Sequence, residues 1–153
     1  MSLLVTLLPA SHVLLDVEAA DKRHLLEQAA GLLEGRTGIG RDAILESLLA
    51  RERLGSTGLG QGIAIPHGRI KGLTSAVGAF LRTRAAVAFD APDGVPVRLV
   101  FVLLVPDKST DLHLQILSEL AQMLSDRTMR AELVSAPDAP MAQRLIAGWR
   151  APA

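Results

Sequence analysis

One histidine, His67, stands in a sequence context that could present a reactive side chain. It lies between Pro66, whose ring fixes φ, and Gly68, which is conformationally permissive, and it follows the short extended stretch 63–65. Imidazole is a good nucleophile near neutral pH and can carry a covalent intermediate, so His67 is a candidate phosphoryl acceptor. The spacing alone leaves a second interpretation open, in which His67 is a surface histidine beside turn glycines.

Groups that could hold the oxygens of a phosphoryl group lie on both sides of His67 in the sequence. Phosphoryl transfer asks for positive charge and exact positioning around three oxygens more than for covalent chemistry by the protein. The candidate donors are the guanidinium groups of Arg51, Arg53 and Arg69 and the hydroxyl groups of Ser56 and Thr57.

A second histidine, His113, is predicted in the first turn of a helix over 111–124, on the same apolar stripe as Ile116 and Leu117. A partly buried imidazole at a helix N-terminus is disfavoured in its charged form, so it would be a neutral donor able to bind an anion. The alternative is a histidine at the edge of the core that bonds a backbone carbonyl. For His12 and His24 we expect structural roles only.

Several other chemistries are excluded or weakly supported. The chain has no cysteine, which excludes disulfides, thiolate nucleophiles and Cys-ligated zinc. The glycines at 58, 60 and 62 form neither a GxGxxG nor a P-loop pattern, and residues 55–58 miss the GxSxG spacing. The four histidines are far apart and form no metal-binding pair. We therefore expect no metal and no cofactor.

Alternating helical and extended patterns must position these residues. The continuously apolar run 98–105 predicts a strand that is covered on both faces, in the middle of a sheet. Helices interleaved with such strands predict an α/β fold, a small mixed β-sheet flanked by helices in an α/β sandwich, as one domain over 1–153. The patterns predict strands at 12–18, 76–83 and 98–105, a turn at 90–94, a helix capped by Asp21 that ends within 35–40, and further helices at 41–54, 111–124, 128–134 and 138–149.

The composition of the chain indicates which kinds of partner and which cellular compartment to expect. The 153 residues are 49% apolar and 21% charged, which is typical of a globular domain. Sixteen basic residues balance sixteen acidic ones, and only one Trp and three Phe are present with no Tyr, so we expect no nucleic-acid partner. The apolar run 99–105 is too short for a membrane span, and no Lys or Arg precedes Lys22 to form the basic start of a signal peptide. We expect a cytoplasmic protein.

A longer motif resembles a known family. The stretch RERLGSTG at 51–58, running into IAIPHGR at 63–69, is similar to the signature of the enzyme IIA domains of the fructose/mannitol type (PTS EIIA type 2) of the bacterial phosphotransferase system. The segments 89–97, 104–106 and 113–114 resemble the rest of that pattern. The resemblance implies that His67 is phosphorylated, on Nε2, by the phosphohistidine of an HPr-like carrier. It also implies that His113 and Arg51 line the site, and Ser56 and Thr57 match the Gly-Ser-Thr-Gly loop of the family.

Two branches of this family compete. In the sugar-transport branch a B domain is phosphorylated on a cysteine, which this chain lacks, so we expect no fused B domain. The length of the chain and the RERLGSTG wording most resemble the nitrogen-regulatory enzyme IIA, whose phosphorylation state is read by protein partners such as potassium-transport proteins or sensor kinases. The alternatives are a stand-alone sugar-specific IIA that passes phosphate to a separate IIB protein, and a binding module that is not phosphorylated.

Overall fold

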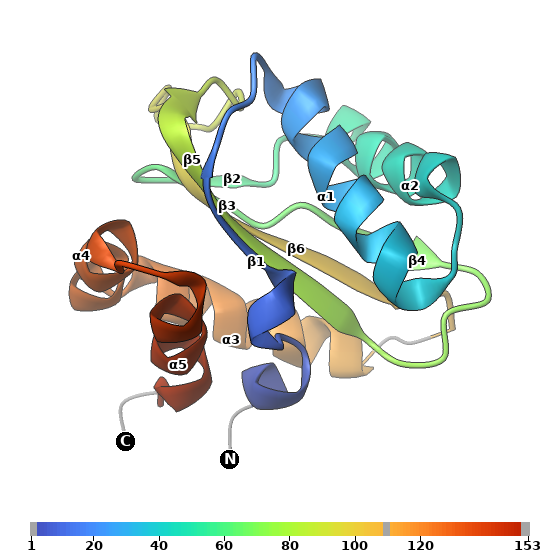
Figure 1. The fold of residues 1–153 in the computed structure, drawn as a ribbon. Helices are drawn as coiled ribbons and strands as arrows, with labels where there is room; N and C mark the ends of the chain where they lie inside the picture. The colour runs from blue at the N-terminus through green and yellow to red at the C-terminus, as the bar shows by residue number, and fades with distance from the viewer. Residues whose placement is uncertain (1–2, 109–110, 151–153) are drawn as a thin grey trace.

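The computed structural model describes residues 3–108 and 111–150, and its centre is a mixed sheet of six strands (Figure 1). The strand order is β1-β5-β6-β3-β2, and β4 pairs with β6 beside β3. The strands are β1 (Val13–Val17), β2 (Gly58–Gly60), β3 (Ile63–Ala64), β4 (His67–Ile70), β5 (Val77–Val87) and β6 (Val97–Pro106).

Strand β6 is the centre of the sheet, as its apolar run predicts. It pairs antiparallel with β5 on one side and parallel with both β3 and β4 on the other. Every residue from Leu99 to Val105 is buried, because helices cover both faces of the sheet at this strand.

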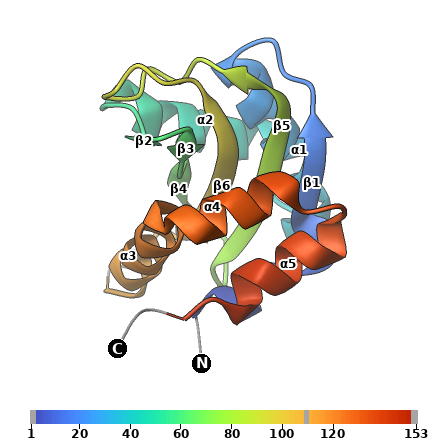
Figure 2. The same cartoon turned by 90° about the vertical axis from the view of Figure 1, so that its left-hand side faces the viewer.

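The helices form a layer on each face of the sheet. Helices α1 (Lys22–Thr37) and α2 (Arg41–Arg53) cover one face, and α3 (Asp111–Ser125), α4 (Arg127–Ser135) and α5 (Ala139–Gly148) cover the other (Figure 1). Two short 3-10 helices, η1 (Leu3–Thr6) and η2 (Ala10–His12), join the second layer. Figure 2 shows α4 and α5 lying across this face of the sheet. The predicted α/β sandwich is confirmed.

Helix ends follow the capping rules. The Asp21 carboxylate accepts a hydrogen bond of 2.8 Å from the backbone N–H of His24, which fixes the start of α1. The helix ends at Gly38, whose φ of 76° is accessible to glycine at little cost. Asp126 and Asp138 cap α4 and α5 in the same way as Asp21.

The sheet is larger than the sequence pattern predicts. Strand β5 continues to Val87 instead of ending at Thr83. After Arg82 its register with β6 shifts, residues 84–86 are exposed, and Val87 then pairs with Val97. The glycine-rich stretch 55–62 contains β2, which pairs antiparallel with β3. Local propensity does not reveal such strands, since tertiary pairing forms them.

No helix in the two described ranges is both long and apolar enough to cross a membrane.

Candidate functional site

His67 is the first residue of β4, not the last residue of a strand as the sequence pattern suggests. Strand β3 runs beside Leu99 and Val100 of β6, and β4 resumes the same alignment with His67 opposite Leu103. Between the two strands, the carbonyl of Pro66 accepts a hydrogen bond of 2.9 Å from the N–H of Leu103. His67 is therefore held by a continuous backbone ladder along the central strand.

Gly68 provides space beside His67 more than conformational freedom. Its φ is not positive, but a Cβ at this position would lie 2.3 Å from Oγ of Ser47 on α2. The Ser47 hydroxyl donates a hydrogen bond of 3.1 Å to the carbonyl of Arg69, which ties α2 to β4. One helical turn after Ser47 comes Arg51, on the same face of the helix. The close approach of α2 to β4 at Gly68 thus places the Arg51 side chain next to His67.

The two ring nitrogens of His67 have different partners. Nδ1 lies 2.8 Å from the carbonyl oxygen of Ile65, and a carbonyl can only accept, so Nδ1 carries the proton. Nε2 then has a free lone pair and accepts a hydrogen bond of 3.3 Å from Nε of Arg51. A half-buried histidine in this tautomer has its nucleophilic nitrogen directed at a guanidinium group.

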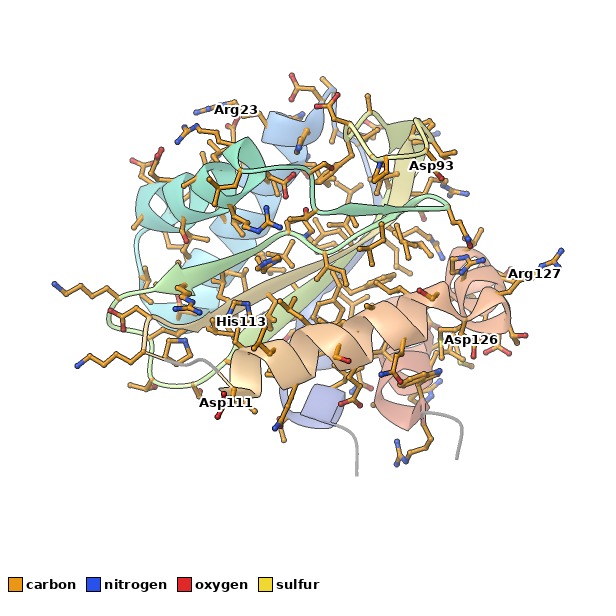
Figure 3. The ribbon with its side chains drawn as sticks, turned by 180° about the vertical axis from the view of Figure 1, so that it is seen from behind. Arg23, Asp93, Asp111, His113, Asp126 and Arg127 are labelled. Atoms are coloured by element: carbon orange, nitrogen blue, oxygen red, sulfur yellow. The ribbon has the colours of Figure 1, made fainter. Side chains whose placement is uncertain are left out.

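His113 lies beside His67 and is buried, with only 7% of its surface exposed. The centroids of the two imidazole rings are 5.4 Å apart, and the rings meet edge to face at 69°. Figure 3 shows His113 on the side of α3 that faces the sheet. Neither ring nitrogen of His113 has a hydrogen-bond partner within the described part of the chain. Among the described residues, His113 is therefore not bonded to a backbone carbonyl, and its imidazole has no partner there.

Both histidines are held in the neutral form. Burial lowers the pKa of His67, the hydrogen bond to Ile65 opposes this effect, and the charge of Arg51 lowers the pKa further. Burial also lowers the pKa of His113, and the neighbouring His67 and Arg69 act in the same direction. Near neutral pH the site therefore presents two uncharged imidazoles.

The two hydroxyl groups predicted to contact phosphate already form hydrogen bonds within the protein. The Ser56 hydroxyl donates a hydrogen bond of 2.6 Å to the carbonyl of Phe89 and accepts one of 3.0 Å from the N–H of Gly58. The Thr57 hydroxyl donates to the carboxylate of Glu52, which also accepts from the N–H of Thr57 at 3.2 Å. These contacts fix the loop after α2. A role for Ser56 and Thr57 in binding phosphate stays a prediction.

Sequence reasoning did not assign a role to Glu52 or Lys22. The Glu52 side chain is 5% exposed and pairs with the Lys22 ammonium group at 2.6 Å. The ammonium group also lies 4.6 Å from the centre of the Phe89 ring. Glu52 is part of the RERLGSTG motif, so its position was a usable signal, whereas Lys22 at the start of α1 carries none.

The other two candidate arginines take different positions. Arg69 is exposed, and alternation along β4 places it on the same face as His67, from where its charge acts on His113. The Arg53 guanidinium bonds Glu46 at 3.0 Å on the exposed side of α2 and does not join the site. The structure thus brings together His67, His113 and Arg51, with Arg69 nearby.

The remaining histidines have structural contacts, as expected. His12 is buried, with Nδ1 2.9 Å from the carbonyl of Gly78, and Nδ1 of His24 accepts from the N–H of Ala20. Among residues 3–108 and 111–150, no group of three or more His, Cys, Asp or Glu side chains is arranged to hold a metal ion.

Comparison with known proteins places the chain in a family. A family model described as "Phosphoenolpyruvate-dependent sugar phosphotransferase system, EIIA 2" matches residues 6–148. A nitrogen regulatory protein of Pseudomonas aeruginosa is 45% identical over 134 residues, which cover 87% of each chain. The crystal structure of the nitrogen regulatory protein IIA-Ntr from Neisseria meningitidis matches with a TM-score of 0.91 at 48% identity, covering 95% of this chain and 99% of that one. A fructose-specific EIIA component of Haloferax volcanii is 39% identical over 107 residues, 70% of each chain.

The fold and these matches define a phosphoryl carrier of the IIA class. The chain belongs to the EIIA type 2 family of the phosphoenolpyruvate-dependent sugar phosphotransferase system. The matches to the two nitrogen regulatory proteins are closer and longer than the match to the fructose-specific component. They favour the nitrogen-regulatory interpretation over a sugar-specific one.

Proposed function

We propose that Nε2 of His67 accepts a phosphoryl group from the phosphohistidine of an HPr-like carrier protein, and that protein partners then read the phosphorylation state. The observation that carries this proposal is the pair of contacts at the His67 ring. The Ile65 carbonyl holds the proton on Nδ1, and Arg51 directs a cation at the free lone pair of Nε2.

In the proposed step the Nε2 lone pair attacks the phosphorus of the donor. The bond between phosphorus and the donor imidazole breaks, and its electron pair returns to the donor nitrogen. Nδ1 of His67 keeps its proton, so the step needs no separate base. The chain would act here as a phosphotransferase component, in the transferase class.

Positive charge and a neutral donor are available for the three oxygens that arrive. Arg51 now donates to Nε2, and once that lone pair is used in bonding phosphorus its guanidinium is free to donate to the oxygens. His113, with both ring nitrogens unpaired within the described residues, can donate one further hydrogen bond. Exposed Arg69 adds charge from β4.

The salt bridge between Glu52 and Lys22 supports this site indirectly. It fixes the residue next to Arg51 and, through Thr57, the loop that follows α2. We assign Glu52 and Lys22 positioning roles.

Exposed apolar side chains near the site suit a protein partner. Leu54 follows the last turn of α2 and is 84% exposed, while Leu112 and Leu114 flank His113 and are 43% and 65% exposed. A protein donor must bring its own phosphohistidine against His67, and an apolar rim favours such a contact. The phosphoryl group then adds about 1.5 to 2 negative charges to this rim, enough to repel or recruit a second partner. We place these encounters in the cytoplasm.

The test is phosphorylation in a purified system. The protein is incubated with phosphoenolpyruvate, enzyme I and the HPr-like carrier from its own source, and the phosphate is mapped by mass spectrometry under conditions that preserve phosphohistidine. We expect one phosphoryl group, absent in His67→Ala and kept in His24→Ala, which removes an exposed histidine of α1.

Two results would redirect the proposal. No phosphate, under conditions that charge the HPr-like protein, would make the chain a binding module. Discharge that requires a separate IIB protein and its sugar would favour the sugar-specific role.

A further inference from the structure

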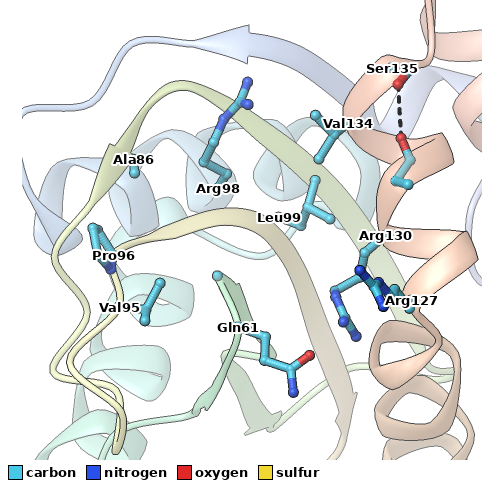
Figure 4. A pocket seen from close by; sticks show the side chains of 12 residues that line it. Gln61, Ala86, Val95, Pro96, Arg98, Leu99, Arg127, Arg130, Val134 and Ser135 are labelled. Carbon is cyan, nitrogen blue, oxygen red and sulfur yellow. Dashed lines mark hydrogen bonds between the residues drawn. The ribbon is translucent and has the colours of Figure 1, made fainter.

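A second concave site lies on the α4 side of the molecule (Figure 4). It is a cavity of about 630 Å³ between the turn that joins β2 to β3, the start of β6 and helix α4. This volume falls within the usual range of small-molecule sites, roughly 300 to 1,000 Å³. The cavity and the His67 site lie at different points along β6. Leu99, which lines the cavity, pairs with Ile63, whereas His67 pairs with Leu103. Four residues along a strand separate the two sites by roughly 13 Å.

The cavity wall is largely apolar and in part exposed. Leu99 is buried at its base, while Val95 and Val134 keep 42% and 40% of their surfaces in contact with solvent. Pro96 completes the wall beside Val95 (Figure 4). Removing these side chains from water would stabilise an apolar ligand.

Three arginines and no carboxylate line the same cavity, in a chain whose formal net charge is zero. The Arg127 side chain has no hydrogen bond or salt bridge to any described residue, and Arg130 uses Nη1 to bond the Leu124 carbonyl at 3.1 Å. Arg98 turns toward the carbonyl of Thr83, at 3.3 and 3.4 Å, and contributes mainly its charge.

Two carboxylates beside the cavity, Asp93 and Asp126, form no salt bridge with these arginines among the described residues. Asp93 accepts hydrogen bonds from the N–H groups of Gln61 and Val95, and Asp126 caps α4 by accepting from Met129. Both carboxylates accept from backbone donors, and the charge of Arg130 also acts on Asp126. The guanidinium groups of Arg127 and Arg130 are left able to bind an anion.

Gln61 lies at the cavity with a positive φ, a backbone conformation that residues other than glycine rarely adopt. Its φ is 57°, and the Asp93 carboxylate fixes its backbone N–H at 2.8 Å. In Figure 4 its side-chain amide extends from the β2–β3 turn into the space on the side of Arg127 and Arg130.

We propose that this cavity binds a small organic anion, in which a carboxylate, phosphate or sulfonate group is attached to an apolar body. The anionic group lies between Arg127, Arg130 and the Gln61 amide. The apolar body lies against Leu99 and Val134.

A suitable probe is 8-anilinonaphthalene-1-sulfonate, which joins a sulfonate to an apolar aromatic body and fluoresces when removed from water. Titration of the full chain is expected to give one saturable site. Arg127→Glu is expected to weaken the affinity by about tenfold or more, because it replaces a charge-assisted donor with a like charge. Arg127 is exposed and unpaired among the described residues, so the variant should fold as the wild type does, which circular dichroism checks.

Two controls separate the proposed site from unspecific binding. Arg144→Glu makes the same charge change at an exposed position of α5 outside the cavity and should leave the affinity unchanged. The uncharged analogue N-phenyl-1-naphthylamine should bind the wild type and Arg127→Glu equally, since it carries no sulfonate. Probe-induced changes in the backbone amide NMR signals should centre on Gly62 and Ala131.

The proposal is overturned if Arg127→Glu binds the probe as tightly as the wild type, or if the NMR changes map to α1 and α2. Sedimentation with phosphatidylcholine vesicles containing phosphatidylglycerol, lost in Arg127→Glu, would also overturn it by assigning the arginines to lipid headgroups. His67→Ala should bind the probe normally. The outcome is thus independent of whether His67 accepts phosphate.

Discussion

Replacing Arg51 with alanine is expected to slow phosphoryl transfer to His67 without unfolding the protein. The side chain makes two contacts, one from Nε to Nε2 of His67 and one of 2.8 Å from Nη1 to the carbonyl of Gly55. Gly55 is exposed, so water can replace the second contact in the variant. Among the described residues, no other group donates to Nε2 of His67, and under the proposed function this contact becomes a bond to the phosphoryl oxygens.

The expected loss follows from the strength of such a bond. A hydrogen bond to a charged group contributes about 1.5 to 3 kcal/mol, and each 1.36 kcal/mol in the barrier changes a rate about tenfold. Arg51→Ala should therefore reduce the rate of transfer by about 10- to 150-fold. Arg51→Lys should recover part of the loss, because it restores a cation without the planar fork of donors.

The assay is single-turnover transfer from the phosphorylated HPr-like donor, followed by rapid quench and separation of the phosphorylated protein. Arg53→Ala is the matched control, since Arg53 is two residues away but bonds Glu46 on the exposed side of α2. It should transfer at the wild-type rate. A rate for Arg51→Ala within about twofold of wild type would refute the assigned role of Arg51, because even the weakest such bond contributes more than that.

Four further predictions test the same structure. His113→Ala should slow single-turnover transfer by about 2- to 12-fold, the effect of one neutral hydrogen bond, with partial recovery in His113→Gln; unchanged rates in both would remove His113 from the site. The pKa values of His67 and His113 are lowered in the folded chain, so near pH 6.5 the unfolded chain binds protons that the folded chain does not. The free energy of unfolding, measured in urea, should therefore fall as the pH is lowered through about 6.5. A rise would contradict this prediction. Leu103→Ala, at a fully buried position of β6, should lower the free energy of unfolding by about 2 to 5 kcal/mol, measured by urea unfolding. Gly68→Ala should slow transfer by forcing α2 away at Ser47, and the added change Ser47→Ala should recover part of the rate; a double variant as slow as the single one would show that the contact is not the cause.

The elements that the sequence predicts well are those whose signals are local. Asp21 caps α1 as its position before an apolar periodic segment suggests, and the unbroken apolar run of β6 could only be covered on both faces. The extension of β5 to Val87 was not predictable, because residues 84–86 are exposed and pair only through an irregular register. Strand β2 is equally hidden, since its glycines favour a turn until β3 pairs with it.

Some features of the site could likewise be predicted from the sequence and others could not. His67 and Arg51 are prominent in the motif, but their contact depends on Gly68 admitting α2, which no spacing rule contains. The hydroxyl group of Ser56 looked like a free donor because its partner, the Phe89 carbonyl, is distant in the sequence. That the nitrogens of His113 have no partner among residues 3–108 and 111–150 is known only once the packing of α3 on the sheet is known.

The bond from Nδ1 of His67 to the carbonyl of Ile65 bears on how readily mutation can damage this protein. Every amino acid carries that carbonyl, so no single side-chain replacement at position 65 deletes the acceptor. Ile65 is buried, and the position therefore asks for an apolar side chain of suitable volume but not for any particular functional group. Where a carboxylate side chain orients a histidine, one substitution removes the acceptor that fixes the tautomer. Here the acceptor belongs to the main chain, so the tautomer preference changes only if the main chain moves.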